Sequence, residues 1–209
     1  GSGGGQIIRS ALSLSALTKK PFLIKNIRAK REKKGLMPQH LTSVNAVAKL
    51  CNAELEGNFL GSQEISFFPR NIESKNFSIN IGTAGSISLV LQALMPALTQ
   101  ITKPVKIEII GGTDAKMAPP IDYIKYILLK LLSKLGYQAE LEIVRRGFYP
   151  KGGGRVIFKV NPMKLTPYNF VEIGKNLVVN GFSCASQELE KAKVAERQSY
   201  EVKRLLTTQ

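Results

Sequence analysis

The sequence predicts an α/β (α+β) fold of two tandem β-α-β-α-β-β units, residues 1–72 and 73–162, with mixed sheets and helices on one side. The start of a small α/β insert domain is expected over 163–209. Three observations lead to this prediction. Segments with a helical period alternate with short strand-like segments. The same order of segments recurs in both halves, which indicates an internal duplication. Glycine-rich turns recur where a strand precedes a helix, and helices between strands imply crossovers in a mixed sheet.

The first unit lacks the leading strand of the repeat. Residues 6–18 have the period of an amphipathic helix. A strand over 21–27 leads to a second helix over 36–51, and short strands follow around 53–56 and 63–68. The expected apolar stripe of the first helix is Ile7, Ile8, Ala11, Leu12 and Leu14, with Gln6, Arg9 and Ser13 opposite. The expected inward residues of the second helix are Leu41, Val44, Val47, Ala48 and Cys51.

The second unit contains the complete order of elements. Its strand, helix, strand, helix and two final strands are expected over 76–81, 86–98, 105–110, 120–135, 139–145 and 154–160. The pattern then changes to a strand over 176–180 and a charged amphipathic helix over 187–206. That helix ends without a capping residue, and the first unit opens without its first strand. We therefore expect the chain to be truncated at both ends.

Composition narrows the classes of function. The chain has 209 residues, 44% of them hydrophobic, and carries 30 Lys and Arg against 15 Asp and Glu, a net charge of +15. Such an excess favours polyanionic partners, nucleic acid before membrane surfaces. Cys51 and Cys184 form no C-x-x-C pair and indicate a reducing compartment. The longest apolar run, 89–98, is too short to span a bilayer. We expect a cytoplasmic protein without a membrane partner.

Two segments of the first unit suit phosphate groups. The glycine run from Gly3 to Gly5 leads into a helix that carries Arg9, and a helix start with a nearby guanidinium can hold an anion. Gly1-Ser2 can equally be the remnant of an expression tag. A basic segment over 28–34 then precedes Gln39-His40 at a helix start. The basic run is either a solvated loop or a phosphate contact, and His40 is by itself more typical of a capping residue.

Three glycine-rich turns follow in the second unit. The first, over 82–86, joins a strand to a helix but lacks the Gly-Lys-Ser/Thr of a Walker A loop. The second, over 111–114, is followed by Ala118-Pro119-Pro120. The third, over 146–155, contains three consecutive glycines between two strands. A hairpin turn needs only one or two glycines, so this loop is either a flexible hairpin or a ligand-facing one. One histidine and two distant cysteines exclude a common zinc site, and the metal ligands stay unknown.

Together these segments resemble the RNA 3'-terminal phosphate cyclase family. The resemblance runs in order through GGGQIIRSALSLSALT, IRAKREKKGLMPQHLTSV, GTAGSISLVLQALMPAL, GGTDAKMAPPIDYI and RGFYPKGGGRV, over residues 3–160. It implies a ligase-type enzyme in RNA processing that converts an RNA 3'-phosphate end to a 2',3'-cyclic phosphate. ATP would be consumed with release of AMP and pyrophosphate, through enzyme–AMP and RNA–adenylate intermediates. The implied cofactors are ATP and a divalent metal, Mg or Mn, and the implied partners are RNA 3' ends.

The resemblance also implies roles for particular residues. Those that would act on the RNA end or its phosphate are Arg9, Arg28, Arg31, Gln39 and His40. Those that would bind the nucleotide are Gly3, Gly4, Gly5, Gln92 and Pro119. Within this set, Gln92 would lie beside the nucleotide phosphates and the metal, and Pro119 would pack on the adenine.

Two departures from the family pattern bear on activity. Ser2 stands where the family has a metal-binding Glu. The nucleophilic histidine of the family lies near the C-terminus of its members, His40 does not match it, and we expect this chain alone not to become adenylated. One alternative is therefore a catalytically inactive cyclase-like protein in ribosomal RNA processing. An enolpyruvyl transferase, which shares the repeat architecture, and a plain binding module are the others. The oligomeric state is not predicted.

Overall fold

The computed structural model describes residues 4–171 and 178–207. The chain divides into two compact units, Gly1–Tyr168 and Asn169–Gln209. In the described part of the chain no helix is long and apolar enough to cross a membrane.

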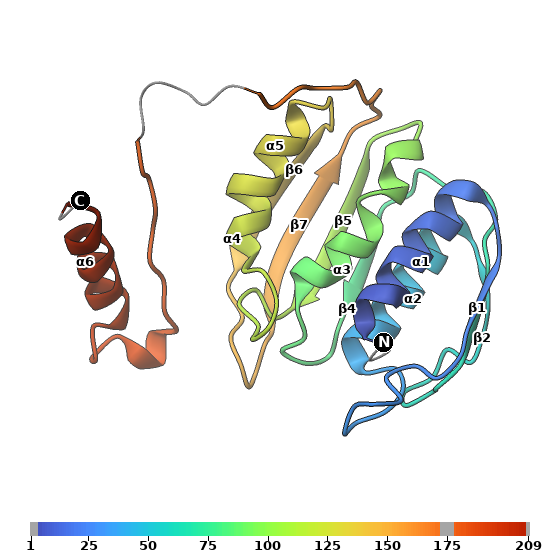
Figure 1. Ribbon diagram of the computed structural model, residues 1–209, viewed down its shortest axis with the longest axis horizontal. Helices are drawn as coiled ribbons and strands as arrows, with labels where there is room; N and C mark the ends of the chain where they lie inside the picture. Colours follow the sequence, from blue (N-terminus) through green and yellow to red (C-terminus); the bar gives the residue numbers. More distant parts are fainter. Residues whose placement is uncertain (1–3, 172–177, 208–209) are drawn as a thin grey trace. The chain divides into compact units, whose positions relative to one another are not determined.

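A three-stranded antiparallel sheet belongs to the first half of the larger unit (Figure 1). The elements are α1 (Gly5–Thr18), β1 (Phe22–Ile24), α2 (Pro38–Cys51), β2 (Glu54–Glu56) and β3 (Ile65–Phe68). The strands lie in the order β1-β3-β2, with Phe22 opposite Phe67 and Leu55 opposite Phe67 on the other side. The rings of Phe22 and Phe67 stack at 5.4 Å between centroids, and Phe67 is fully buried. This aromatic pair anchors the sheet against the core.

A four-stranded mixed sheet belongs to the second half. Its elements are β4 (Phe77–Asn80), α3 (Ile87–Leu94), η1 (Ala97–Gln100), β5 (Val105–Gly111), α4 (Ile121–Tyr123), η2 (Ile124–Leu128), α5 (Leu129–Ser133), β6 (Ala139–Arg145) and β7 (Gly154–Val160). The strand order is β4-β5-β7-β6, with β4 parallel to β5 and the other pairs antiparallel. The predicted β-α-β-α-β-β order and mixed sheet are thus confirmed here. The segment expected to be one helix over 120–135 is a helix with a π-helical turn at η2.

The strand orders support the predicted duplication. The series β1-β3-β2 corresponds to β5-β7-β6, and both series are antiparallel. Among the described residues no strand of the first half corresponds to β4. The first sheet therefore has only antiparallel pairs rather than the mixed pairing expected of both. In β5 and β7 alternate residues are buried, and Figure 1 shows α3, α4 and α5 over one face of this sheet. This agrees with helices on one side.

The buried side of α1 differs from the predicted stripe. Ile7 and Leu14 are 53% and 59% exposed, whereas Arg9 and Ser13, expected on the polar side, are buried. The Ser13 hydroxyl donates to the carbonyl of Ala93, on α3, at 2.8 Å. Because these polar groups find partners across the helix interface, their burial does not leave them unsatisfied. The inward residues predicted for α2 are correct except for Leu41, which is only partly buried.

The smaller unit contains η3 (Gln187–Leu189) and α6 (Val194–Thr207). The helix expected over 187–206 is therefore interrupted by a turn in which Lys193 has a left-handed φ of 48°. The predicted strand over 176–180 is wrong for 178–180, which form no strand, while 176–177 lie outside the described residues. Val178 and Val179 are 73% and 69% exposed, and strand formation needs a neighbouring strand to satisfy backbone groups.

Candidate functional site

Arg9 is a buried cation one turn into α1. Its Nε donates to Gln92 Oε1 on α3 at 2.9 Å, and its Nη2 donates to Gln6 Oε1 at 2.8 Å. Burial lowers the pKa of the Arg9 guanidinium, which nevertheless stays protonated at neutral pH. Both partners are neutral amides, and no carboxylate pairs with Arg9 among the residues that the structure describes. A desolvated positive charge with neutral partners is a favourable contact for a bound anion.

Gln39 and His40 begin α2 and connect it to its neighbours. The backbone N–H of Ser86, the N-cap of α3, donates to Gln39 Oε1 at 2.9 Å. The backbone N–H of Met37 donates to His40 Nδ1 at 3.2 Å, which caps the start of α2. The reading of His40 as a capping residue is therefore confirmed. Burial, followed by the charges of Arg28 and Arg9, lowers the pKa of His40 to about 4.

The protonation of His40 follows from these contacts. At neutral pH the imidazole is uncharged, and because Nδ1 accepts the Met37 N–H, the hydrogen-bond network assigns the ring proton to Nε2. An Nε2 that carries the proton is a donor, without a lone pair for nucleophilic attack. His40 can therefore donate to a phosphate oxygen but is not a nucleophile in this arrangement.

The glycine run lies against the same side chains. A Cβ built on Gly5 would be 2.4 Å from His40 Nε2 and 3.2 Å from Arg9 Nη1, so any other residue there would displace the His40 ring from its present position. Gly4 is the N-cap of α1 and has no side chain to cap it. The first turns of α1, α2 and α3 contain no acidic residue, which leaves their positive helix ends uncompensated. Gly3 lies outside the described residues.

Of the two predicted arginines in the basic segment, one reaches this cluster. The charge of Arg28 contributes to the lowered pKa of His40, and its Nε donates to the Lys33 carbonyl at 3.1 Å. Arg31 is exposed on the same turn, where its backbone N–H donates to the Arg28 carbonyl. The structure thus brings together Arg9, Arg28, Gln39, His40, Gln92 and Gly5. Arg31 lies on the neighbouring loop.

The three glycine-rich loops pack on one another through their backbones. A Cβ on Gly112 would be 2.3 Å from the Ala84 carbonyl oxygen, and one on Gly152 would be 2.7 Å from Ala84 Cα. A Cβ on Gly147 would be 2.6 Å from the Gly111 carbonyl oxygen. These distances bear on the open question about the third loop: Gly147 and Gly152 allow close backbone packing.

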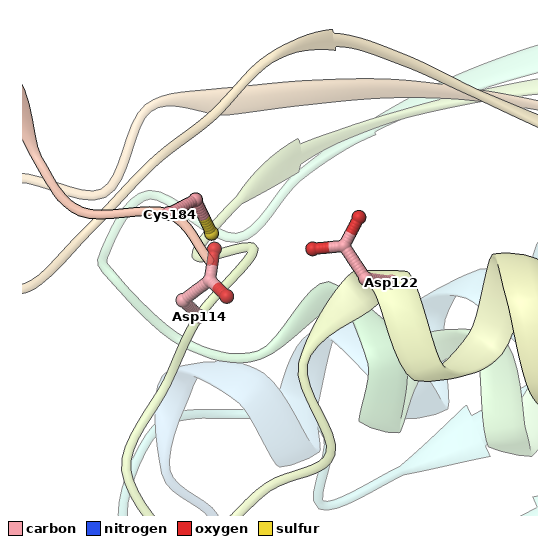
Figure 2. Close-up of side chains that lie close together, drawn as sticks. All are labelled: Asp114, Asp122 and Cys184. Atoms are coloured by element: carbon pink, nitrogen blue, oxygen red, sulfur yellow. The ribbon is translucent and has the colours of Figure 1, made fainter. Parts of the chain in front are cut away.

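Pro119 is exposed in the segment that connects β5 to α4. The ends of this segment carry Asp114 and Asp122, whose carboxylates Figure 2 shows facing one another. Cys184, also labelled there, belongs to the smaller unit. Arg146 donates to both Asp122 oxygens at 2.6 and 2.9 Å and lies 3.6 Å from Asp114 Oδ2. The sequence analysis assigned no role to Asp114, Asp122 or Arg146, although all three lie within the quoted motifs.

Contacts connect these parts at one end of the larger unit. Arg9–Gln92 joins α1 to α3, and Gln39–Ser86 joins α2 to the first glycine loop, which in turn packs on the third loop. In Figure 1 the starts of α1 and α3 and the β5–α4 and β6–β7 connections lie at the same, lower edge. This edge includes the carboxyl ends of the parallel strands β4 and β5, where α/β folds place ligands.

Comparison with known proteins now decides the family. Residues 1–203 match the sequence profile described as RNA 3'-terminal phosphate cyclase. The chain belongs to this family. It is similar to the "RNA 3'-terminal phosphate cyclase" of Hyperthermus butylicus, with 52% identity over 201 residues that cover 95% of this chain and 55% of that protein. The corresponding protein of Sulfurisphaera tokodaii is 47% identical over 209 residues, which cover 99% of this chain and 60% of that protein.

The chain thus spans a little over half of the length of the cyclases it matches. Membership in the cyclase family decides against an enolpyruvyl transferase, the alternative that shared only the repeat architecture. The cluster around Arg9 joins segments that stand in the sequence as separate motifs. The tertiary contacts therefore unite motifs that lie up to 83 residues apart.

Proposed function

We propose that the protein containing this chain converts an RNA 3'-terminal phosphate to a 2',3'-cyclic phosphodiester at the expense of ATP. In this reaction AMP passes from an enzyme–AMP intermediate to the RNA phosphate. The vicinal 2'-oxygen then bonds to that phosphorus, the bond to AMP breaks, and AMP leaves; pyrophosphate is released in the first step. The observation that carries the proposal is the buried Arg9 guanidinium, which has only neutral partners in the described structure.

The electrostatics of the cluster suit this chemistry. A phosphate monoester dianion is a poor electrophile because its charge repels an incoming oxygen, and fixed positive groups lower that barrier. Arg9, the starts of α1 to α3 and the Nε2–H of His40 supply such groups from rigid helices. Arg28 and the exposed Arg31 extend the positive surface toward the RNA strand.

The nucleotide part of the proposal rests on the same edge. Gly3, Gly4 and Gly5 would admit the nucleotide phosphates at the start of α1, with Gln92 beside them and Pro119 against the adenine. Gln92 Oε1 is a possible oxygen ligand for Mg or Mn once Arg9 turns to a phosphate. The described cluster contains no carboxylate, so the divalent metal would be held mainly by phosphate oxygens and water, as Mg commonly is. It would neutralise the phosphate charge there.

His40 does not supply the nucleophile for adenylation in this proposal. Its capping bond and buried, uncharged state leave it as a donor. We therefore propose that the 209-residue chain alone forms no stable protein–AMP bond with labelled ATP. We also propose that the protein acts in the cytoplasm, because its sequence has only two cysteines and no C-x-x-C pair.

The test uses the full-length protein, ATP, Mg and a 5'-labelled oligoribonucleotide with a 3'-phosphate. Cyclisation makes the terminal phosphate resistant to phosphatase, and a 2'-deoxy end must stay sensitive because it lacks the attacking oxygen. Arg9→Gln is expected to abolish most of the conversion. Arg70→Gln, which removes an exposed, ion-paired arginine just after β3, should not. Binding of RNA without conversion of its end would refute the proposal in favour of the inactive cyclase-like alternative.

A further inference from the structure

One arginine holds both ends of the exposed β5–α4 connection. Arg146 makes a two-pronged contact with Asp122, at the start of α4, and approaches Asp114 at 3.6 Å, at the end of the preceding motif. The carboxylates come from the two ends of the segment 115–120, as Figure 2 shows for Asp114 and Asp122. The two aspartates are eight positions apart, but Arg146 lies in the connection between β6 and β7. The clamp is therefore a tertiary contact.

Backbone hydrogen bonds reinforce the clamp. The Thr113 N–H donates to the Gly147 carbonyl at 2.9 Å, and the Gly147 N–H donates to Thr113 Oγ1 at 3.0 Å. The Ile121 N–H donates to the Thr113 carbonyl at 2.9 Å, which closes the segment into a loop. The ends of this loop are thus fixed to the 146–154 motif, while its middle projects outward.

Burial makes the contact stronger than an ordinary surface pair. The Asp122 side chain is 12% exposed and the Arg146 side chain 28% exposed. Partly buried, two-pronged arginine–carboxylate pairs combine charge with a defined geometry, unlike exposed pairs, which contribute little. Lysine cannot reproduce this fork.

The middle of the loop has the chemistry of a base contact. Met117 is 93% exposed, with a left-handed φ of 62°, and Pro119 and Pro120 are exposed beside it. These apolar groups are exposed to solvent on a segment whose ends are fixed, at the edge of the larger unit that carries the Arg9 cluster. Apolar surface of this kind is stabilised when the flat face of a base covers it.

We propose that Arg146 is a positioning residue for the nucleobase: it holds the 115–120 loop in the shape that receives the adenine of ATP. This inference rests on the proposed function, and it assigns the arginine of the 146–154 motif a role at the base instead of at the phosphates. Arg146 acts through Asp114 and Asp122 and does not touch the reacting atoms.

The distinguishing experiment compares a ligand that has a base with one that lacks it. Binding of ATP and of inorganic tripolyphosphate to the full-length protein is measured by calorimetry for wild type, Arg146→Gln and Asp122→Asn. The control is Arg155→Gln, which removes the partner of Glu108 on the outer face of the mixed sheet. We expect Arg146→Gln to weaken ATP binding about tenfold or more through misplacement of the loop. Tripolyphosphate binding should stay within twofold of wild type, and the control should change neither.

Each outcome decides the matter. Equal weakening of both ligands would show a merely structural role, and unchanged ATP binding would show that the clamp is irrelevant to the base; either overturns the inference. Should Arg146→Gln fail to fold, Arg146→Lys and Asp122→Asn carry the same comparison. A wild-type protein that binds ATP but cyclises no RNA end would overturn the proposed function while leaving this comparison valid.

Discussion

The substitution Gly152→Ala tests the packing of the glycine loops. Gly152 has a φ of 66°, and a Cβ there would lie 2.7 Å from Ala84 Cα and 2.8 Å from both Ala84 N and the Thr83 carbonyl oxygen. All three are backbone atoms. They cannot rotate aside as a side chain would, so the first glycine loop as a whole must shift.

The magnitude follows from two terms. An L-residue in the left-handed region costs about 1–2 kcal/mol, and forcing extra volume into a packed site costs about 1–3 kcal/mol. Gly153→Ala is the matched control, because Gly153 has a similar φ of 68° but its nearest neighbour is Arg145 Nη2 at 3.7 Å. The control bears only the backbone term, so Gly152→Ala should be less stable than Gly153→Ala by about 1–3 kcal/mol.

The free energy of unfolding of both variants is measured by urea denaturation followed by circular dichroism. Equal destabilisation by the two substitutions would refute the reasoning. It would mean that the third loop does not pack on the first and that the triple glycine serves turn geometry alone.

Three further predictions follow from single contacts. The only histidine, His40, should titrate in NMR near pH 4. Because this pKa lies below the value of about 6.5 in the unfolded chain, the uncharged imidazole contributes stability that is fully present above pH ~6.5 and is lost as the pH falls through 4. Titration near 6.5 would contradict the burial of the ring. A double-mutant cycle of Arg9→Met with Gln92→Ala should give a coupling of about 1.5–3 kcal/mol in unfolding free energy, since their hydrogen bond is partly buried and charged. A coupling near zero would contradict this hydrogen bond. Tyr137→Phe should destabilise the protein by about 1–3 kcal/mol in thermal or urea unfolding, because it removes the buried hydrogen bond to the Met95 carbonyl. Tyr200→Phe on exposed α6 should have no measurable effect, and equal effects would argue against the buried bond.

Pattern and spacing were sufficient for most secondary structure. The repeat was recognisable because period and element order depend on local residue types, and the strand orders β1-β3-β2 and β5-β7-β6 agree with it. The pattern failed where local preference does not decide. Ile7 and Leu14 fit an apolar stripe but lie exposed, because α1 packs its Arg9 and Ser13 side against α3 instead.

The site shows the same division. The residue types at Arg9, Gln39, His40 and Gln92 suit an anion wherever they stand in the sequence, and the motifs that contain them identified the family correctly. The sequence does not predict which of these side chains touch, because a hydrogen bond between residues 83 positions apart depends on how the helices pack. The clamp of Arg146 on two aspartates was likewise invisible in the linear order.

The amino-acid order alone therefore determined the repeat, the family and the residue types available for phosphate chemistry, since these reside in local period and motif spelling. The packing of the folded chain settled which glycines meet backbone, which histidine nitrogen carries the proton and which arginine holds the 115–120 loop. Those properties arise from contacts between distant segments, and contact is decided by how whole helices and sheets share one core.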